Sequence, residues 1–597
     1  MSRNTTILGQ LNSVYNSYPL KSSKLNSYNS SKKKQREMVS LRKLVVSFVL
    51  VLSVVLIAHL TQGKEIRLKD LKRLSHPIKK ACYSHDGIGV NPKHPTFGAT
   101  GQSFPRLTPA AYTDGVRVPP RQKYSARELS NVFCKQEKCD TSNKYGVNAM
   151  FYAFAQFIDH DIDSMGTGRN SETFPIPVPP GDRFKTPTIP FTRGTFSSEK
   201  VIFIGDPVNQ VNVITGYIDC SQIYGSDPTK AKALRTLQGG LLKVNNVFGE
   251  EFLPNSFVHT NGKFFSGGGN NSIIAGDDRV TEALPISIMQ TIFLREHNRL
   301  ARLIRKRFGI CKKSTKKKRV DEYIYQTARA INCAQIQSIT YREYLSKLLG
   351  KHKINPYKLK FDPDVNVTPA NEFATAAYRF GHSLVSCELH RIDENGKEME
   401  TIQFKDAFNG FRRLTNNKGE LEMLVRGLCT HFSQNLDEKI ADGLRDFLFG
   451  PNVRLDLAAS NIQRGRDAGL PSFNDMRKSL GLKPLSASQM TSDPELREKL
   501  VKYFGEELND LDPWLGILIE PKYGNSQLGR LGTKIVKEQF ERFVKGDPCF
   551  YTHRRKAWMK QVRKAVDRVT LADIIAANTK ISRNDKALSR SAFDFKP

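Results

Sequence analysis

The sequence predicts a mainly α protein, a large multihelical single domain with long loops and little β structure. Apolar residues recur at helical spacing in several long segments after Val147, whereas strict alternation of apolar and polar residues is sparse. No linker rich in Pro, Gly and Ser interrupts the chain between Cys82 and the C-terminus. The 597 residues are 39% hydrophobic and 25% charged, which is enough apolar material for one large core.

Residues 1–40 differ in composition from the rest of the chain and are expected to form a disordered basic tail. They are rich in Ser, Asn and Lys and carry a basic run at 32–36. Too few apolar side chains are present to offset the entropy lost on ordering.

Residues 41–63 have the pattern of a signal peptide or a signal anchor. Arg42 and Lys43 precede an apolar run at 44–60, and small or polar residues follow it. The run is about 17 residues long, at the lower limit for crossing a bilayer, so cleavage and retention as an anchor both stay open. Cleavage is favoured, and it predicts a secreted, extracellular protein that begins near residue 64. An uncleaved run predicts a membrane-anchored protein instead.

Translation can start at Met1 or at Met38. The second start lies just before Arg42 and gives a signal of ordinary length, whereas the first gives an unusually long stretch ahead of the apolar run.

Five later segments carry the helical pattern. They are Val147–Ile162, Ala283–Arg307, Asp321–Leu349, Asn371–Val385 and Lys534–Val544. The segment 174–191 is dense in Pro and is expected to be an extended loop.

The cysteine content indicates an oxidising compartment with some disulfide bonds. The nine cysteines are Cys82, Cys134, Cys139, Cys220, Cys311, Cys333, Cys387, Cys429 and Cys549. No CxxC pair is present, so a zinc site of that type is not expected. The odd number leaves at least one thiol free or bonded to another chain.

Asn270 and Asn366 begin candidate glycosylation sequences.

The chain is strongly basic. Its formal charge of +33 falls to about +25 once residues 1–63 are removed, and a dense basic cluster lies at 312–319. No recognisable nucleic-acid module accompanies this cluster, so nucleic acid is not expected as a partner. Acidic extracellular matrix or cell surfaces are the expected partners, and a merely solvated loop is the alternative.

The segment FYAFAQFIDHDI at 151–162 is an apolar helix that ends with Asp159, His160 and Asp161. Gln156 lies one turn before His160 and therefore on the same face. A histidine in an apolar helix is usually a hydrogen-bonded core residue. Two flanking acids favour a functional site, because carboxylates avoid burial unless they are paired, metal-bound or covalently modified.

A second histidine, His382, follows Gly381 in NEFATAAYRFGHSLV at 371–385. The small residues of this segment leave room for a flat ligand. Spacing alone does not favour a haem ligand here over a core histidine.

Two charged segments could contribute to a site. In AGDDRVTE at 275–282, Arg279 and Glu282 are three residues apart, a spacing that by itself predicts a surface ion pair. Arginines clustered as in LDLAASNIQRGRDAGL at 455–470 often bind carboxylates or phosphates. The polar residues of that cluster are Asn461, Arg464, Arg466 and Asp467.

Oxygen-bearing side chains alternate in TGYIDCS at 215–221. Thr215, Asp219 and Ser221 carry them, and Tyr217 can offer its carbonyl. Calcium takes six to eight such ligands. The pattern is weak by itself, because hydroxyl-rich loops are common.

Taken together and in this order, the segments resemble the animal haem peroxidases, especially the invertebrate secreted branch that includes chorion peroxidase and peroxinectin. The resemblance extends from about Cys82 to Phe595 and implies the animal haem peroxidase fold for residues 64–597. The matching motifs are HPTFGATGQSFPRL, FIDHDI, IDCSQIYGS, AGDDRVTE, FLREHNRLA, YRFGHS, NIQRGRDAGLPSFN and DRVTLADIIAANT.

The resemblance assigns a role to each histidine. His160 matches the distal acid–base residue, with Arg279 beside it and Gln156 as a distal glutamine. His382 matches the proximal ligand of the haem iron, and Asn461 matches the residue that accepts its ring hydrogen bond.

The resemblance also implies how cofactors are held. Asp159 and Glu282 match carboxylates that attach haem b through ester bonds, and Arg379 and Arg464 match arginines near the haem propionates. The implied calcium ligands are Asp161, Thr215, Tyr217, Asp219 and Ser221. Since Asp161 adjoins His160, calcium loss is expected to disturb catalysis as well as stability.

The implied function is that of a secreted haem peroxidase. It would reduce hydrogen peroxide through a ferryl intermediate and oxidise phenolic or tyrosyl groups or halides, for matrix or coat cross-linking or for defence. The alternative is a haem-containing or inactive adhesion or matrix-binding protein on the same fold. An integrin-like KGD tripeptide at 545–547 is the sequence feature that would support adhesion.

The sequence departs from the family pattern at several positions. Ala283 stands where some vertebrate members have a Met that forms a third covalent link to haem, so that link is excluded and chloride oxidation is not expected. The second cysteine of the family is missing near Val90, so Cys82 must pair elsewhere or stay reduced. Cys220 replaces a more usual Ala, and Ala468 replaces a His.

Overall fold

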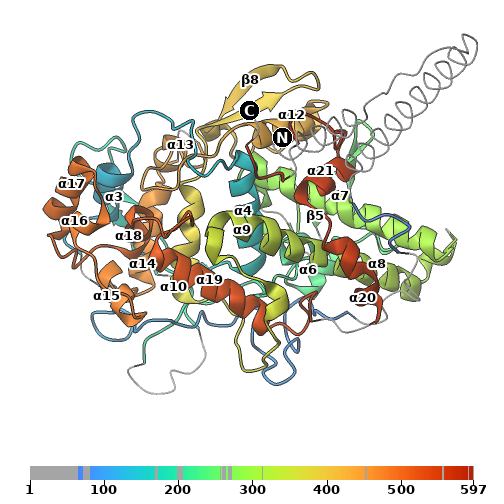
Figure 1. Cartoon of the computed structure of the whole chain (residues 1–597), viewed down its shortest axis with the longest axis horizontal. Coiled ribbons are helices and arrows are strands. Elements are labelled where there is room, and N and C mark those ends of the chain that lie inside the picture. Colours follow the sequence, from blue (N-terminus) through green and yellow to red (C-terminus); the bar gives the residue numbers. More distant parts are fainter. Residues whose placement is uncertain are drawn as a thin grey trace, which may run out of the picture. The chain divides into compact units, whose positions relative to one another are not determined.

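Helices make up most of the regular structure in the part of the chain that is described (Figure 1). The computed structural model describes residues 65–71 and 81–595, except 121, 168–171, 198–205, 256, 259–263, 266–271, 312, 451–452, 554–556 and 589–590. The predicted tail 1–40, the signal segment 41–63 and the acceptor Asn270 lie outside the described residues.

The mainly α prediction is confirmed. The α-helices are α3 (Ala126–Leu129), α4 (Ala149–Ile162), α5 (Ser221–Tyr224), α6 (Pro228–Ala233), α7 (Leu284–Arg307), α8 (Lys318–Ile339), α9 (Leu345–Leu349), α10 (Asn371–Thr375), α11 (Arg412–Asn416), α12 (Glu420–Thr430), α13 (Asp442–Arg445), α14 (Leu457–Asp467), α15 (Phe473–Ser479), α16 (Ala487–Met490), α17 (Pro494–Phe504), α18 (Pro513–Ile519), α19 (Arg530–Lys545), α20 (Ala557–Val566) and α21 (Leu571–Asn578).

Short 3₁₀ and π segments connect several of these helices. The 3₁₀ segments are η2 (Asp278–Thr281), η3 (Ser314–Lys316), η5 (Gly350–His352), η6 (Pro356–Lys358), η7 (Ala377–His382) and η8 (Phe404–Asp406), and the π segments are η1 (Ser130–Cys134) and η4 (Thr340–Tyr344).

The strands form four separate antiparallel pairs, each of two strands. They are β1 (Ile176–Pro177) with β2 (Thr188–Ile189), β3 (Asn245–Val247) with β4 (Glu250–Phe252), β5 (Phe257–Val258) with β6 (Phe264–Phe265), and β7 (Glu388–Ile392) with β8 (Glu398–Gln403). The first pair lies in the segment 174–191 that the Pro content predicts to be extended.

The central helix α4 packs against α7, and α7 packs in turn against α8. Phe157 of α4 and Phe293 of α7 are fully buried, and their rings stack with centroids 4.9 Å apart. Burying a side chain of this size contributes about 1.5–3 kcal/mol. The buried Asn148 precedes α4 and donates to the carbonyls of Cys429 and Ala592, which fixes the start of the helix. These contacts fix the position of α4, and with it the position of its last turn.

Two predicted helices are subdivided in the structure. The segment 321–349 continues without a gap through α8, η4 and α9. The segment 371–385 was predicted as one helix, and this is wrong, because the backbone leaves helical geometry at Ala376 (φ −135°, ψ −66°) and resumes as the 3₁₀ segment η7. Arg379 donates from Nε to the carbonyl of Ala374, which satisfies an acceptor freed by the break.

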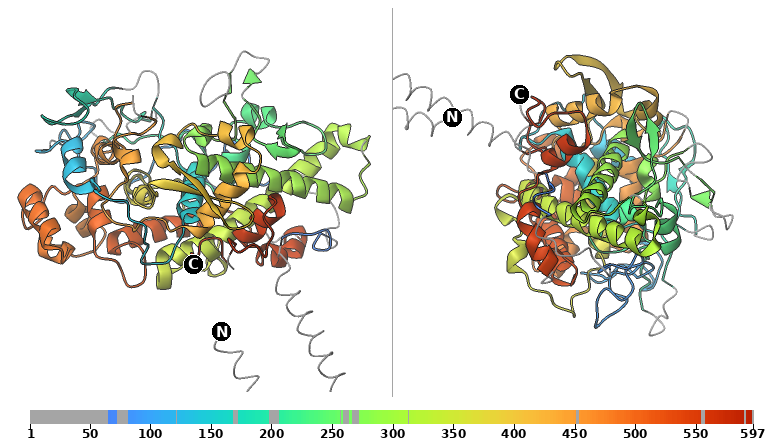
Figure 2. Two further views of the ribbon diagram at one scale, coloured as in Figure 1. Left: turned by 90° about the horizontal axis from the view of Figure 1, so that it is seen from above. Right: turned by 90° about the vertical axis from the view of Figure 1, so that its right-hand side faces the viewer.

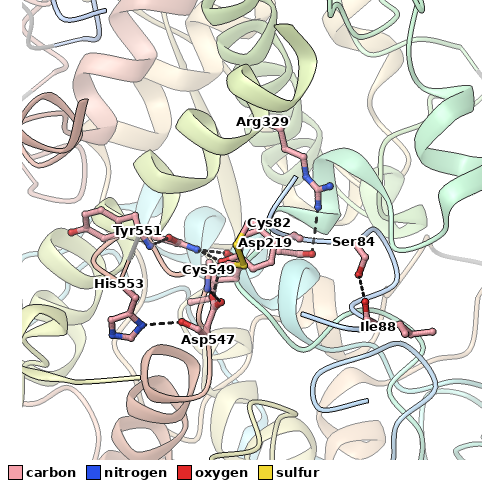
Figure 3. The surroundings of a disulfide bond; sticks show 12 residues. Cys82, Ser84, Ile88, Asp219, Arg329, Asp547, Cys549, Tyr551 and His553 are labelled. Atoms are coloured by element: carbon pink, nitrogen blue, oxygen red, sulfur yellow. Dashed lines mark hydrogen bonds and ion pairs between the residues drawn. A yellow bond between two sulfur atoms is a disulfide. The ribbon is translucent and has the colours of Figure 1, made fainter. Parts of the chain in front are cut away.

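Two disulfide bonds connect distant parts of the chain. Cys82 is bonded to Cys549, and Cys139 is bonded to Cys387. The prediction that Cys82 pairs elsewhere or stays reduced is thus resolved in favour of pairing with Cys549 (Figure 3). Five cysteines of the described chain are outside disulfides.

The KGD tripeptide lies next to the Cys82–Cys549 disulfide bond. The carboxylate of Asp547 is fully buried and accepts hydrogen bonds from the Tyr83 hydroxyl at 2.6 Å and from the Cys549 amide at 2.7 Å (Figure 3). A carboxylate used in this way supports the fold and is not presented to an integrin.

Among the helices of the described residues, none combines the length and the apolar content needed to cross a bilayer.

Candidate active site

The two histidines lie on neighbouring elements. His160 is in the last turn of α4, which lies in the middle of the described ribbon (Figures 1 and 2). His382 is the last residue of η7, which packs against α4. Arg379, one 3₁₀ turn before His382, acts electrostatically on Asp159 beside His160. The fold therefore brings together two segments that are more than 200 residues apart in the sequence.

His160 is 2% exposed and is surrounded by acids. Its Nδ1 lies 3.6 Å from Asp277 Oδ1, and its Nε2 lies 3.6 Å from Glu282 Oε2. The buried Nδ1 has no hydrogen-bond partner among the described residues. Gln156 donates from Nε2 to the same Glu282 oxygen at 3.1 Å. The predicted distal residues thus form one group around the imidazole.

Arg279 is the cation of this group. Its Nε and Nη2 donate to the two oxygens of Asp277 at 2.9 and 3.0 Å, and its Nη1 lies 3.4 Å from Asp159 Oδ2. Nη2 also donates to the carbonyl of Asp163 at 3.0 Å. The guanidinium is thereby fixed next to Asp277, which faces Nδ1 of His160.

Burial and the surrounding charges shift the pKa values of these acids in opposite directions. Burial raises the pKa of Asp159 and raises that of Asp163 well above its usual value. Burial alone would also raise the pKa of Asp277, but Arg279 and His160 lower it to about 2. Asp277 is therefore the stable anion of the group. For Asp159, the nearby positive charges do not offset the effect of burial on its pKa.

The side of the site around His382 is simpler. Asn461 of α14 donates from Nδ2 to His382 Nδ1 at 2.8 Å, and its Oδ1 accepts from Arg379 Nη1 at 3.2 Å. Desolvation and the neighbouring Arg379 lower the pKa of His382 to about 3, so the imidazole is neutral. A neutral imidazole is the form that ligates a metal.

Several features around His382 and His160 fit a flat, anionic ligand. A methyl group placed on Gly381 would meet no atom of the described residues within 4 Å. The side chains of Asp159 and Glu282 are 31% and 34% exposed, although the nearby side chains of His160 and Asp277 are buried. These observations agree with the residues that the sequence assigns to haem.

Arg464 lies near Arg379 but faces another direction. Its Nη1 donates to Asp467 at 2.7 Å and its Nη2 to the carbonyl of Thr192 at 3.1 Å. Burial lowers its pKa to about 10, and the nearby Arg379 acts in the same direction. An anion between the two guanidinium groups would relieve this repulsion.

The predicted calcium residues converge beside α4. Asp161 accepts hydrogen bonds from the backbone amides of Cys220 at 3.1 Å and Ser221 at 2.6 Å. Thr215 donates to Asp219 Oδ1 at 2.9 Å, whereas Asp219 Oδ2 is buried without a hydrogen-bond partner among the described residues. The ring hydroxyl of Tyr217 donates to the carbonyl of Phe97, which directs the side chain away from this oxygen cluster.

Burial and mutual repulsion act on the two carboxylates. Burial, followed by the charge of Asp219, raises the pKa of Asp161 well above its usual value, and burial raises the pKa of Asp219 to about 6. The nearest cation is Arg329 of α8, whose Nη2 lies 3.5 Å from Asp219 Oδ2 (Figure 3). Two buried carboxylates that have only this guanidinium beside them among the described residues fit a site for a hard cation.

Sequence reasoning did not identify three residues of these groups. Asp277 and Asp163 lie inside or next to motifs that the sequence singled out, so their acidic character was an available signal. Arg329 comes from another helix, 110 positions after Asp219, and no spacing pattern connects the two.

Comparisons with known proteins agree with this geometry. The family model for the animal haem peroxidases matches residues 82–593. Human myeloperoxidase is 32% identical over 565 residues, which cover 85% of this chain and 73% of that protein. Peroxinectin A of Dictyostelium discoideum is 31% identical over 517 residues, covering 83% and 93%. The structure of peroxidase A from Dictyostelium discoideum superposes with a TM-score of 0.77 at 28% identity, covering 87% of this chain and 100% of that chain.

Proposed function

The chain belongs to the animal haem peroxidase family, and on this premise we propose that it is a secreted peroxidase that oxidises phenolic or tyrosyl groups and halides other than chloride. As a haem peroxidase it takes hydrogen peroxide and a reducing substrate. The observation that carries the proposal is the pair of dissimilar histidines, one held among acids at the end of α4 and one held by an amide at the end of η7.

The residues around the two histidines would hold haem b. His382 would offer Nε2 to the iron, since its Nδ1 faces Asn461. Asp159 and Glu282 would form the ester bonds, and Arg379 and Arg464 would bind the propionates. When bound, haem supplies the electron transfers that couple peroxide reduction to oxidation of the reductant.

His160 acts as the acid–base residue. It takes the proton from one oxygen of hydrogen peroxide and delivers it to the other, so that water can leave. Arg279 stabilises the negative charge that develops on the departing oxygen. Asp277 orients Arg279 through its two hydrogen bonds and faces Nδ1 of His160. Gln156 positions the Glu282 carboxylate on the other side of the ring.

Ligation by His382 requires a change in its hydrogen bonding. Nε2 can bind a metal only if Nδ1 carries the ring proton, whereas the Asn461 amide here donates to Nδ1. A half-turn of the amide would present Oδ1 as the acceptor that the family pattern implies. Arg379 would then lose its bond to Oδ1 and would be free to bind a haem propionate.

Calcium would be held by Asp161, Thr215, Asp219 and Ser221 together with the carbonyl of Tyr217. Asp161 directly follows His160 in α4, so this ion would fix the last turn of the distal helix.

The basic surface and the signal-like segment 41–63 support action outside the cell, on matrix or on a cell surface. Lys313, Lys316, Lys317, Lys318 and Arg319 surround the start of α8 and would attract acidic polymers. Ala283 excludes a third covalent link to haem, which is why chloride is left out of the proposed substrates.

The test is an absorption spectrum of the purified protein together with guaiacol and iodide oxidation assays, each with and without hydrogen peroxide. We expect a Soret band and turnover that depends on peroxide. Absence of the band would remove the haem assignment, and a band without turnover would favour the adhesion alternative. Chloride oxidation as fast as that of iodide would contradict the proposed substrate range.

A further inference from the structure

Three potential metal ligands meet on the surface of the β7–β8 hairpin. His390 lies in β7, Glu398 begins β8, and His431 directly follows α12 (Figure 1). One ligand atom from each residue lies within 4.8 Å of the other two. None of these residues belongs to the haem or calcium groups described above.

The two imidazoles share one carboxylate. Glu398 Oε1 lies 2.5 Å from His390 Nδ1 and 3.7 Å from His431 Nε2. The imidazole rings are stacked, with centroids 3.5 Å apart and an angle of 4° between their planes.

Two local features of the backbone bring these three residues together. The strand register shifts between Leu389 and Arg391, which places His390 in the irregular part of β7 and can redirect its side chain. The strand also lies directly on α12 at Gly427. A Cβ on that glycine would be 1.8 Å from the His390 carbonyl oxygen, so no other residue fits there without a shift of the backbone. Gly427 is one turn before His431 and brings the two histidines together.

The hydrogen bonds of His431 orient it as a ligand. Its Nδ1 lies 3.3 Å from the carbonyl oxygen of Gly427 and 3.2 Å from Thr430 Oγ1. Because a carbonyl oxygen can only accept, Nδ1 carries the proton and Nε2 keeps a lone pair on the side of Glu398. Metal-binding histidines are commonly fixed by a carbonyl in this manner.

We propose that His390, Glu398 and His431 form a site for a divalent transition metal of the Zn²⁺ and Cu²⁺ class. Two imidazole nitrogens and one carboxylate oxygen suit these borderline cations, whereas Ca²⁺ and Mg²⁺ prefer oxygen ligands throughout. The three side chains are 25%, 50% and 29% exposed in that order, so water can complete the coordination. Binding requires the rings to tilt out of their parallel stack, which their partial exposure allows.

The metal would connect three elements of the fold. It would join both strands of the hairpin to the end of α12, and the carbonyl of His431 accepts from the amide of Ala149 at 2.9 Å, in the first turn of α4. The expected consequence is greater stability of this region. No role in peroxide chemistry is assigned to the metal.

The test is calorimetric titration of the holoenzyme with zinc chloride in a buffer saturated with calcium. We expect one zinc ion bound per chain in the wild type. His390→Gln and His431→Gln should each weaken binding by at least about tenfold, and the double variant should lose it. Circular dichroism in the absence of zinc checks that each variant is folded.

The matched control is His94→Gln. His94 Nε2 lies 2.8 Å from Asp364 Oδ1, so it is also a surface histidine beside a carboxylate, but no second imidazole stacks on it in the described structure. This variant should bind zinc as the wild type does. The double variant binding zinc as tightly as the wild type, or a wild type without saturable binding, would overturn the proposal.

A second measurement does not depend on heats of binding. Zinc should raise the thermal midpoint of the wild type and of His94→Gln, because a ligand that binds only the folded state stabilises it. The double variant should show no increase. An equal increase in all three proteins would place the ion elsewhere and contradict the assignment.

Discussion

The two sides of the proposed haem site are built on different principles. Around His160, the carboxyl groups of Asp159, Asp163, Asp277 and Glu282 lie near the Arg279 guanidinium. Burial raises the pKa of Asp159 and Asp163, while Arg279 and His160 lower that of Asp277 to about 2. Around His382 there is one amide and one arginine, and the imidazole is neutral. The first arrangement can accept and release a proton next to a developing charge. The second holds a ligand in one orientation.

The backbone differs in the same way. His160 is in the last turn of a regular 14-residue helix, whereas His382 ends a six-residue 3₁₀ segment that follows a break. The orientation of His160, the proposed acid–base residue, therefore depends on the regular helix α4. The orientation of His382, the proposed iron ligand, depends on a 3₁₀ turn and on the Asn461 side chain.

The largest expected effect separates the two histidines. His382→Ala should abolish stable ligation of the haem iron and all activity, because the variant lacks the imidazole proposed to bind the iron. His160→Ala should keep haem and lose peroxide reactivity by about 10²- to 10⁴-fold, the usual contribution of a general acid–base residue. The Soret absorbance per chain and the rate of reaction with hydrogen peroxide measure the two quantities. Equal haem loss in both variants would contradict the assigned roles.

The proposed ester bonds involve Asp159 and Glu282, which both lie on the His160 side. Denaturation in acidified organic solvent, followed by mass spectrometry, should leave haem on the wild-type chain. The Asp159→Asn, Glu282→Gln double variant should release it. Free haem in the wild-type extract would refute covalent attachment.

Calcium removal should affect the distal side more than the proximal side. Asp161 belongs to α4 and is next to His160, whereas no predicted calcium ligand is in η7 or α14. Chelation, or Asp161→Asn, should lower the thermal midpoint and reduce peroxide reactivity while the ligation of His382 persists. The positions of the haem absorption bands report on that ligation. Loss of haem before loss of peroxide reactivity would reverse the expected order.

How much the sequence could predict also differs between the two sides. The helical period identified α4 and α7 closely, and the acids beside His160 marked a functional site without any known relative. His382 had only small neighbours, and its role rested on the resemblance. The break at Ala376 was missed because alanine is a strong helix former, so local propensity argued for a continuous helix.

The sequence could not predict which residues far apart in the chain lie next to each other in the fold. Cys82 and Cys549 are 467 residues apart, and nine cysteines allow many connectivities. Arg329 beside Asp219 depends in the same way on how α8 packs (Figure 3). Such contacts follow from the tertiary fold and leave no local pattern.

A moderate effect is expected on the proximal side. Asn461→Ala removes the hydrogen-bond partner of His382 Nδ1 and leaves Arg379 without its amide acceptor. Loss of a residue that orients a metal ligand typically reduces affinity or activity by about 10- to 100-fold. We expect weaker haem retention and shifted absorption bands with a folded chain. Asn461→Asp, which restores an acceptor, should recover part of the loss, and an alanine variant with wild-type haem affinity would contradict the positioning role.

The smallest effect tests the electrostatics of the distal side through pH. The pKa of Asp277 is about 2 in the fold, below its ordinary value of 3.8, so its carboxylate stabilises the folded state above pH 3.8. That contribution, about 2 kcal/mol, is lost as pH falls from about 4 to about 2. Asp277→Asn should therefore lower the free energy of unfolding by about this amount at pH 7, and the difference from wild type should shrink in acid. The neighbouring Asp278 is the control. Its side chain is 65% exposed and forms a surface ion pair with Lys230, so Asp278→Asn should change stability by less than about 1 kcal/mol. Urea unfolding of the holoenzyme across this pH range measures both variants. A difference for Asp277→Asn that stays constant down to pH 2 would mean that packing, and not charge, is what the Asp277 side chain supplies to the distal site.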